Sequence, residues 1–400
     1  MPAIRSNDCI GLAALARLVF EGADLAPLGE RLIARATAAP PDAGALMDLA
    51  TLRILTGDRE GGLAIQAGTL ATDRLFRRPA PGACGLRLLA LVAPGDMMAN
   101  TPLDFLLEGS DIELSLLYVD ADTPLPDPLP EHDVAFLAIG ESEANLATLQ
   151  AIEPALRRWP RPLLNREAAR ISQLTRDGVC ALLQGVDSIV APATARTPRE
   201  TLARLGRSEI GVEGVLPAAR FPIIARPIGS HAGAGLAKLD DAAAVAAYLA
   251  DQPTEQFYLA PFIDYSGADG LFRKQRIALI AGRPFVCHLA ISQHWMVHYM
   301  NAAMLECPEN RAEEARFMET FDDDFAQRHR AAFEALHARI GLDYFAIDCA
   351  ETRDGRLLLF EADVAMIVHN MDPPDMFPYK GPQMLKVFAA FQKLARGAAA

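Results

Sequence analysis

Three carboxylates that could bind a metal ion flank a tight turn, Asp348 before it and Glu361 and Asp363 after it. The turn contains Asp354-Gly355, a strong signal for a two-residue hairpin loop. Counting outward from that loop places Asp348 directly opposite Glu361, and Asp363 lies two residues further along on the same face. The pattern therefore predicts three carboxylates that converge on one side of two strands.

Like charges that face each other destabilise a hairpin, and the neighbours of these acids along the strands are apolar. A divalent cation would resolve the conflict, and hard oxygen ligands suit magnesium. The sequence thus predicts a magnesium site. Two alternatives stay open: the strand ends splay so that the acids face water, or a three-residue loop shifts the register by one residue and breaks the arrangement.

A second segment, residues 221–239, joins an apolar strand that carries Arg226 to a loop of small residues. In order, the candidate residues of this loop are Gly229, Ser230, His231, Gly233 and Gly235. Backbone N–H groups in such a loop can approach phosphate oxygens, and a basic residue on the strand can hold a phosphate beside them. The spacing matches neither GxxxxGK[ST] nor GxGxxG. The alternative is a surface turn between two strands.

A third segment opens an apolar strand with three cations, Arg273, Lys274 and Arg276. Because side chains alternate along a strand, Lys274 and Arg276 share one face and Arg273 takes the other. Cations beside a phosphate-binding loop can stabilise a transferring phosphoryl group and a developing oxyanion. A solvated, charged strand end is the alternative.

Composition indicates a globular chain with more than one domain. It has 400 residues, of which 51% are hydrophobic and 22% charged. A net charge of −13 gives no sign of nucleic-acid or anionic-membrane binding. The six cysteines are scattered without a CxxC pair, which favours reduced thiols. The start of the chain does not read as a signal peptide, and no run reaches the ~18 apolar residues of a membrane span. We therefore expect a soluble, cytoplasmic protein.

The elements that must position these residues fall into three regions. Residues 1–80 read as helices over residues 10–20, 28–37, 45–55 and 61–77. The last two are similar to a tetratricopeptide hairpin, although an ordinary helical cap fits equally well. Residues 84–165 alternate strands with helices, which predicts a small α/β domain with a parallel sheet. Residues 166–400 begin with short helices and become rich in strands from Phe221, with a long charged helical stretch over 310–340 and a β-hairpin over 345–363.

The order of the three segments resembles the ATP-grasp superfamily, particularly its RimK-like amino-acid ligase branch. A basic strand with a glycine loop comes first, then a second basic strand, then paired acidic strands ending in Glu361-Ala362-Asp363. The resemblance runs from about Leu163 to Lys393. It implies an α/β (α+β) ATP-grasp fold: a helical cap, a small pre-grasp domain, and a two-lobed ATP-grasp domain over residues 166–400 with ATP between the lobes.

The resemblance also implies roles for single residues. Arg226 would hold the ATP phosphates beneath the glycine loop, and Arg176 stands at an earlier basic position. The segment Tyr258, Leu259 and Ala260 would contact adenine through its backbone. Arg273 and Arg276, with Lys274 between them, would hold the γ-phosphate and the acyl-phosphate oxygens, and Asp348, Glu361 and Asp363 would bind one or two Mg²⁺ ions. The sequence departs from the family pattern at two of these positions, where the family usually has Lys for Arg226 and Asn for Asp363.

Two further segments, residues 288–301 and 364–379, match no general role in the family. Their positions after the basic strand and after the acidic strand suggest the walls of a second-substrate site. The candidate residues are His294, His298, Asn301, Met366 and His369. A lone histidine is more often a hydrogen-bonded structural residue than a catalyst, and these histidines lack the usual spacing of a zinc site.

Taken together, the resemblance implies a ligase that uses ATP and magnesium to activate a carboxylate as an acyl phosphate. It would join that carboxylate to an amine and release ADP and phosphate, with amino acids, peptides or proteins as substrates. Two alternatives are a phosphotransferase on the same fold and an ATP-binding pseudo-enzyme whose N-terminal helices dock a protein. A homodimer is a reasonable prior expectation.

Overall fold

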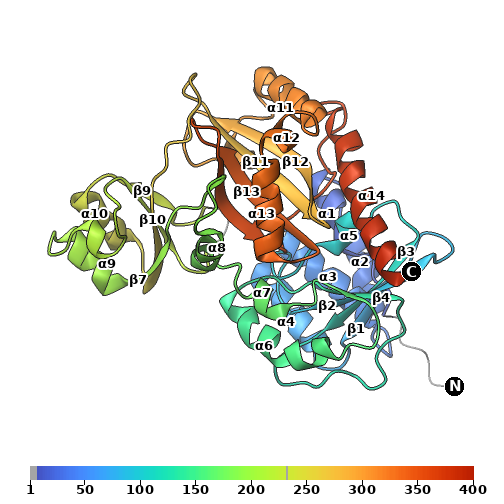
Figure 1. The fold of residues 1–400 in the computed structure, drawn as a ribbon. Helices are drawn as coiled ribbons and strands as arrows, with labels where there is room; N and C mark the ends of the chain where they lie inside the picture. The colour runs from blue at the N-terminus through green and yellow to red at the C-terminus, as the bar shows by residue number, and fades with distance from the viewer. Residues whose placement is uncertain (1–6, 231–232) are drawn as a thin grey trace.

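The computed structural model describes residues 7–230 and 233–400 and shows an α/β protein built around three separate sheets (Figure 1). A small four-stranded unit projects at the left of the view, and a large five-stranded sheet occupies the centre. The third sheet, also five-stranded, lies below the large sheet. None of the helices in the described ranges is long and apolar enough to cross a membrane.

Four helices begin the described chain: α1 (Leu12–Phe20), α2 (Ala26–Ala36), α3 (Ala43–Leu55) and α4 (Arg59–Leu70). Asp42 and Asp58 cap the last two by accepting a backbone N–H of the first turn. The helices α1, α2 and α3 share a small core that includes Leu15, Leu32 and Leu52, and α4 packs on α3. The prediction of one helix over 61–77 is wrong at its end, because β1 (Leu75–Arg78) is a strand that buries Phe76.

The first sheet has the order β1-β3-β2-β4-β5, with β2 (Leu86–Val92), β3 (Ile112–Tyr118), β4 (Val134–Leu137) and β5 (Leu163–Leu164). These four strands are parallel, as predicted, but β1 adds an antiparallel edge, so the sheet is mixed. The helices α5 (Leu103–Leu106), α6 (Glu143–Arg157) and α7 (Ala168–Ile171) follow β2, β4 and β5 along the chain. The antiparallel edge ties the helical start of the chain to this sheet.

The small sheet has the order β7-β10-β8-β9, from β7 (Ala195–Pro198), β10 (Gln256–Pro261), β8 (Ile223–Pro227) and β9 (Ala237–Leu239). The helices α9 (Arg199–Gly206) and α10 (Ala242–Asp251) pack on it through a core of their own, which also takes in the short 3-10 helix Val212–Gly214. All pairings in this sheet are antiparallel. The small sheet and its helices thus form a unit with a hydrophobic core of its own.

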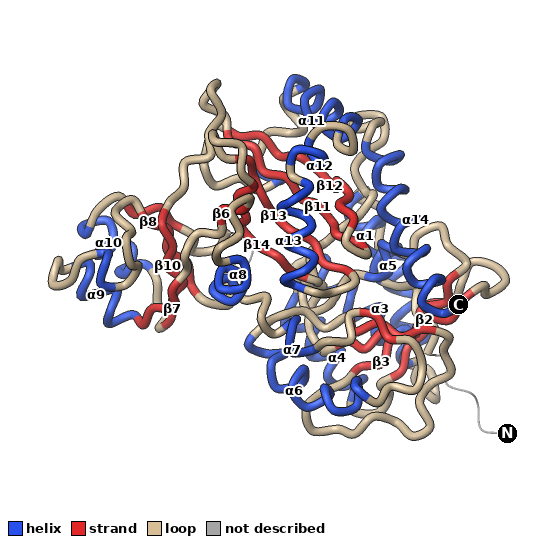
Figure 2. The backbone as a smooth tube through the Cα atoms, in the orientation of Figure 1, coloured by secondary structure: helices blue, strands red, loops and turns tan. Residues whose placement is uncertain are grey.

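The large sheet has the order β12-β11-β13-β14-β6, from β12 (Arg283–Ser292), β11 (Phe272–Ile280), β13 (Tyr344–Glu351), β14 (Leu357–Asp363) and β6 (Ile189–Val190). Figure 2 shows α13 lying across this sheet and α14 running along its other side. One face packs with α8 (Arg176–Leu183), α11 (Pro308–Thr320), α12 (Phe325–Arg328) and α13 (Arg330–Ile340). The opposite face packs with α14 (Lys380–Ala399) and the first sheet. The expected single helical stretch over 310–340 is instead three helices, α11, α12 and α13.

The predicted hairpin over 345–363 forms, but its turn is not the predicted one. Thr352 pairs with Arg356, so three residues rather than two make the loop. A bulge then follows, because Cys349 faces Leu359 whereas Asp348 faces Glu361. Phe360 is the unopposed extra residue, and it restores the register that a three-residue loop would have shifted. The predicted pairing of Asp348 with Glu361 is confirmed by a different route.

Candidate active site

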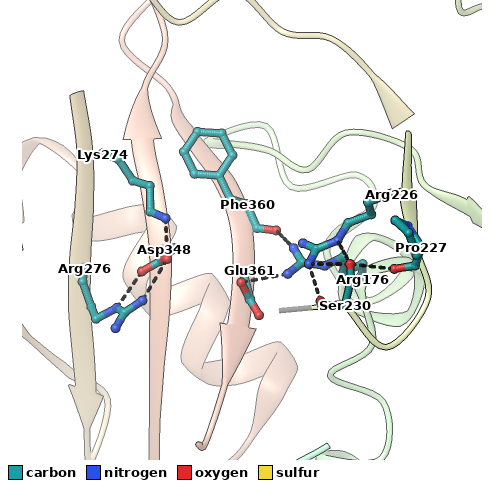
Figure 3. A network of polar contacts seen from close by, with 9 residues as sticks. All are labelled: Arg176, Arg226, Pro227, Ser230, Lys274, Arg276, Asp348, Phe360 and Glu361. Carbon is teal, nitrogen blue, oxygen red and sulfur yellow. Dashed lines mark hydrogen bonds and ion pairs between the residues drawn. The ribbon is translucent and has the colours of Figure 1, made fainter. Parts of the chain in front are cut away.

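A cavity lies between the small sheet and the large one, and seven of the candidate residues line it: Arg176, Arg226, Gly229, Ser230, Tyr258, Glu361 and Asp363. Its lining comes from β8 and the loop after it, from β10, α8 and β14, and from residues 141–143 after β4. Figure 3 shows the polar contacts that cross this region.

Arg226 is a buried cation beside the glycine loop. It is 8% exposed, and its guanidinium donates to the backbone oxygen and hydroxyl of Ser230 (Figure 3). Burial, together with the nearby Arg176, lowers the pKa of Arg226 to about 10. In the described part of the chain, the hydrogen bonds of Arg226 go to Ser230 alone and no carboxylate lies at ion-pair distance. A buried guanidinium in this state favours an anion beside it.

Arg176 occupies the first turn of α8 and points toward β14. Its guanidinium lies 2.9 Å from the Glu361 carboxylate and donates to the Phe360 carbonyl at 3.1 Å (Figure 3). The side chain of Thr175 caps the helix by accepting the Gly178 N–H, which fixes where α8 begins. The structure therefore brings Arg176 and Arg226, 50 residues apart in the sequence, to one cavity.

The glycine loop has the backbone that its composition predicts. Gly229, Gly233 and Gly235 have positive φ values of 76°, 76° and 67°, a region that other residues rarely adopt. Gly233 lies against the imidazole of His298, and a Cβ added there would meet Nε2. His231, one of the predicted loop residues, lies outside the described residues.

Asp348 is held by two cations rather than left for a metal. Its carboxylate, in a residue that is 2% exposed, accepts from Arg276 Nε at 2.8 Å and Nη2 at 3.1 Å, and lies 2.8 Å from Lys274 Nζ. Burial raises the pKa of Asp348, but Arg276 and Lys274 outweigh it and hold the pKa well below its usual range. Both oxygens are thus already paired in this state.

The other two acids differ from Asp348 and from each other. Burial raises the pKa of Glu361, but Arg176 lowers it below its ordinary value. Burial, together with the nearby Glu361 and Glu141, raises the pKa of Asp363 to about 7. Asp363 accepts the backbone N–H of Ala365 at 3.0 Å. The charge of Asp363 is the least compensated of the three.

In this structure the three carboxylates do not meet in one cluster, and their binding of a metal stays a prediction. Across residues 7–230 and 233–400, no group of three or more His, Cys, Asp or Glu side chains is arranged to hold a metal. The reason is that Lys274 and Arg276 form ion pairs with Asp348, while Arg176 forms an ion pair with Glu361. Strand cations therefore resolve most of the like-charge conflict for which the sequence suggested a metal.

Arg273 lies away from this cavity. It is on the opposite face of β11 from Lys274 and Arg276, and it pairs with Glu313 of α11 and with Asp269. Its predicted contact with the γ-phosphate is therefore wrong in this structure, because strand alternation turns it to the other side of the sheet.

The adenine-contacting segment also needs correction. Tyr258 and Leu259 sit on the central strand of the small sheet, where each pairs with β7 on one side and β8 on the other. Their backbone groups are therefore used by the sheet. Ala260 pairs with β8 and lies past the end of β7. The side chain of Tyr258 does line the cavity.

Glu141 is a cavity residue that the sequence analysis missed. It follows β4 and lines the cavity opposite β14, and burial raises its pKa to about 7. A signal was present, since polar residues at the carboxyl end of a parallel strand mark the usual ligand edge of an open α/β sheet. The sequence Ile139-Gly140-Glu141-Ser142 has that form. A Cβ on Gly140 would meet Ala365, so this loop lies directly beside the end of β14.

The second-substrate candidates divide into two groups. His298 lies by the glycine loop, its Nε2 is buried with no hydrogen-bond partner in the described residues, and burial and Lys274 lower its pKa. The side-chain oxygen of Asn301 accepts the backbone N–H of His298. By contrast, His294 is exposed and Met366 is a core residue at 3% exposure. His369 packs on Phe105 and burial lowers its pKa to about 4.

The chain was compared with known proteins. No protein-family model and no curated protein matches it. Solved structures do. The RimK-domain ATP-grasp protein of Sphaerobacter thermophilus is 17% identical and aligns over 78% of this chain and 100% of its own, with a TM-score of 0.43. The ATP complex of Bacillus anthracis D-alanine–D-alanine ligase is 10% identical over 79% and 98%, with a TM-score of 0.47. The VanG D-Ala:D-Ser ligase of Enterococcus faecalis is 14% identical over 66% and 74%, with a TM-score of 0.39. These distant similarities concern the fold alone.

Proposed function

We propose that this protein is an ATP-grasp enzyme that uses ATP and Mg²⁺ to join a carboxylate to an amine. The single observation that carries the proposal is Arg226, a buried guanidinium beside a left-handed glycine loop with no carboxylate partner among the described residues. Arg176 adds a second positive charge in the same cavity. Two guanidinium groups and the backbone N–H groups of a glycine loop form the pattern that phosphate oxygens need.

The residues on the other wall fit a divalent cation. Asp363 and Glu141 both have pKa values raised to about 7, so their ionised forms lack sufficient positive charge nearby. We propose that Glu361 and Asp363 would hold the Mg²⁺, with Asp348 acting instead to orient Lys274 and Arg276. When bound, the ion would neutralise charge on the phosphate groups of ATP.

The chemistry then follows from which residues face the reacting groups. Arg226 and Arg176 hold the phosphates of ATP, while Lys274 and Arg276 orient the substrate carboxylate. A carboxylate oxygen attacks the γ-phosphorus, the bond from phosphorus to the β–γ bridging oxygen breaks, and ADP leaves with an acyl phosphate formed. The nitrogen of a neutral amine then attacks the acyl carbon, the C–O bond to phosphate breaks, and the amine proton passes to solvent. The protein contributes positioning and charge neutralisation.

The substrates would be amino acids, peptides or proteins that carry the carboxylate and the amine, and the reaction would take place in the cytoplasm, where ATP is plentiful. The free state of all six cysteines fits a reducing compartment. We also propose that the protein forms a homodimer and that the α3–α4 pair is a tetratricopeptide-like hairpin.

The test is product analysis with the full-length chain. The protein is incubated with ATP, Mg²⁺ and pooled amino acids and dipeptides, and ADP, phosphate and new amides are measured by chromatography and mass spectrometry. A ligase gives ADP, free phosphate and amide in equal amounts. A phosphorylated product without free phosphate would favour the phosphotransferase, and nucleotide binding without turnover would favour the pseudo-enzyme.

A further inference from the structure

A second cavity lies between the N-terminal helices and the first sheet, and it shares no lining residue with the candidate active-site cavity. Its walls come from α3, from residues 9–12 and from strands β1 to β3. Phe76 of β1 and Met47 of α3 are buried together there, with Tyr118 of β3 packed beside them. Figure 1 shows the helices α3 and α4 next to this sheet. The proposed ligase reaction uses none of these residues.

Asp48, on α3, is a buried carboxylate in the wall of this cavity. The residue is 2% exposed and accepts the backbone N–H of Ile10 at 2.8 Å and of Gly11 at 3.3 Å. Among the described residues it has no Lys, Arg or His at ion-pair distance. Burial raises its pKa to about 6. The two backbone donors offset part of the free-energy cost of burying this carboxylate, and a cation would offset more.

Asp104, on α5, brings a second carboxylate to the same cavity. It is 7% exposed and lies 2.6 Å from Arg78 Nε, and it accepts the Leu12 N–H at 2.9 Å. Among the described residues, Arg78 thus pairs with Asp104 and leaves Asp48 without a cation at ion-pair distance.

A third polar group points to a ligand independently of the acids. Thr101 lines the cavity and is 3% exposed, and its hydroxyl has no hydrogen-bond partner among the described residues. Buried hydroxyls are nearly always bonded, so this hydroxyl is open to a hydrogen bond from a bound group. An ammonium group, with three N–H donors, can serve a carboxylate and a hydroxyl at once.

The size and the remaining walls define the rest of the ligand. The cavity has a volume of about 120 Å³, and an engineered protein cavity of about 150 Å³ holds benzene, which has six heavy atoms. About five heavy atoms therefore fit. Apart from the groups named above, much of the wall is apolar, with Ile54, Val92 and Leu114 among its residues. A short alkyl chain with one charged end matches this lining.

We infer that this cavity binds a small primary alkylammonium compound, with its ammonium group between Asp48 and the Thr101 hydroxyl and its alkyl chain against the apolar walls. The probe is n-butylammonium, which has five heavy atoms, and the matched probe is n-butanol, which has the same size and no charge. Both are added to the full-length protein at pH 8 and equal ionic strength. Binding is followed by calorimetric titration and by the melting temperature.

With the natural sequence, saturating n-butylammonium is expected to raise the melting temperature by about 2 °C, and n-butanol by much less. Asp48→Asn should weaken n-butylammonium binding by about tenfold or more, because a charge-assisted hydrogen bond is lost. Glu21→Gln, an exposed change in the same region, controls for nonspecific attraction of the amine and should bind like the natural protein.

Thr101→Val keeps the test decisive if Asp48→Asn fails to fold. It removes the unbonded hydroxyl with nearly the same volume, so the protein should fold and should bind n-butylammonium several-fold less tightly. Equal binding of n-butanol and n-butylammonium, or unchanged binding by both variants, would overturn the inference.

Discussion

Arg276 and Asp348 face each other across β11 and β13, and two hydrogen bonds of 2.8 and 3.1 Å join their side chains. Lys274, two residues earlier on the same face, approaches the same carboxylate to 2.8 Å. One buried anion thus holds two cations side by side (Figure 3). Without it, the two positive charges would repel each other at the point where we place the substrate carboxylate.

This pair should be strongly coupled in stability. Arg276→Met leaves the Asp348 carboxylate with Lys274 alone in an apolar setting, and should lower the free energy of unfolding by about 3 kcal/mol. Asp348→Asn should cost a similar amount. Because each variant already breaks the pair, the double variant should cost clearly less than the sum, with a coupling energy above about 1 kcal/mol in urea unfolding.

The exposed pair of Arg396 with Asp111 is the matched control, since both side chains are about half exposed at 42% and 51%. The same cycle there should give a coupling below about 1 kcal/mol. Additive costs for Arg276 and Asp348 would show that the interaction drawn from the geometry contributes little.

Arg226 should decide nucleotide binding. Arg226→Ala removes the buried guanidinium beside the glycine loop and should abolish the rise in melting temperature that ATP with Mg²⁺ produces. Arg226→Lys keeps the positive charge but loses the planar guanidinium with its paired N–H donors, so part of the rise in melting temperature should remain. The measurement is thermal unfolding with and without ATP and Mg²⁺. Arg220→Ala, an exposed change on the same segment, should behave like the natural protein; a lost response there would discredit the assignment.

The site could be predicted in part because its segments carry local signals. A glycine loop after a basic strand and an Asp-Gly turn between apolar strands can be read without knowing the fold. The pairing of Asp348 with Glu361 was obtained from a two-residue loop, yet the loop has three residues and a bulge at Phe360 compensates. The local sequence does not distinguish a two-residue loop from a three-residue loop, because a glycine at position 355 suits both.

What the sequence could not supply is long-range neighbourhood. The cations that hold Asp348 come from β11, which pairs with β13 although more than 60 residues separate them. Glu141 reaches the cavity from another sheet. In one case the information was present but unused: alternation already placed Arg273 opposite Lys274 and Arg276, which argues against one site for all three.

Asp363 should make stability depend on pH. Its pKa in the folded protein is raised to about 7, mainly by burial, so the folded state holds this proton more tightly than the unfolded chain does. The stability that the proton gives is full below the ordinary aspartate pKa and is lost as pH rises through about 7. Unfolding in urea without metal should therefore cost about 1–2 kcal/mol less at pH 8 than at pH 5.5 from this group alone.

Asp363→Asn, which cannot ionise, should flatten this part of the profile and stabilise the metal-free protein at pH 8. Magnesium with ATP should reduce the same loss in the natural protein, because a bound cation favours the carboxylate. Asp122→Asn, at an exposed loop position, supplies the control. An unchanged slope in Asp363→Asn would mean that another group titrates.

Gly355 should affect the hairpin and spare the active site. It has a φ of 79° in the three-residue turn, so Gly355→Ala forces a side chain into the left-handed region and should cost about 1 kcal/mol. Gly68→Ala is the contrast, because Gly68 is exposed inside α4 with open space around it, and that change should stabilise by about 0.5–1 kcal/mol. Chemical unfolding measures both.

ATP-dependent phosphate release should be unchanged in Gly355→Ala once substrates are known, and ATP-dependent thermal stabilisation can be measured before then. The reason is the bulge at Phe360, which lies between the turn and Glu361. The ring centroids of Phe360 and Tyr265 are 5.0 Å apart, so this packing holds the bulge in place. We therefore expect the bulge, and not the turn, to fix the pairing of Asp348 with Glu361. A variant that folded well but lost nucleotide binding would show that the turn, and not the bulge, fixes the carboxylates.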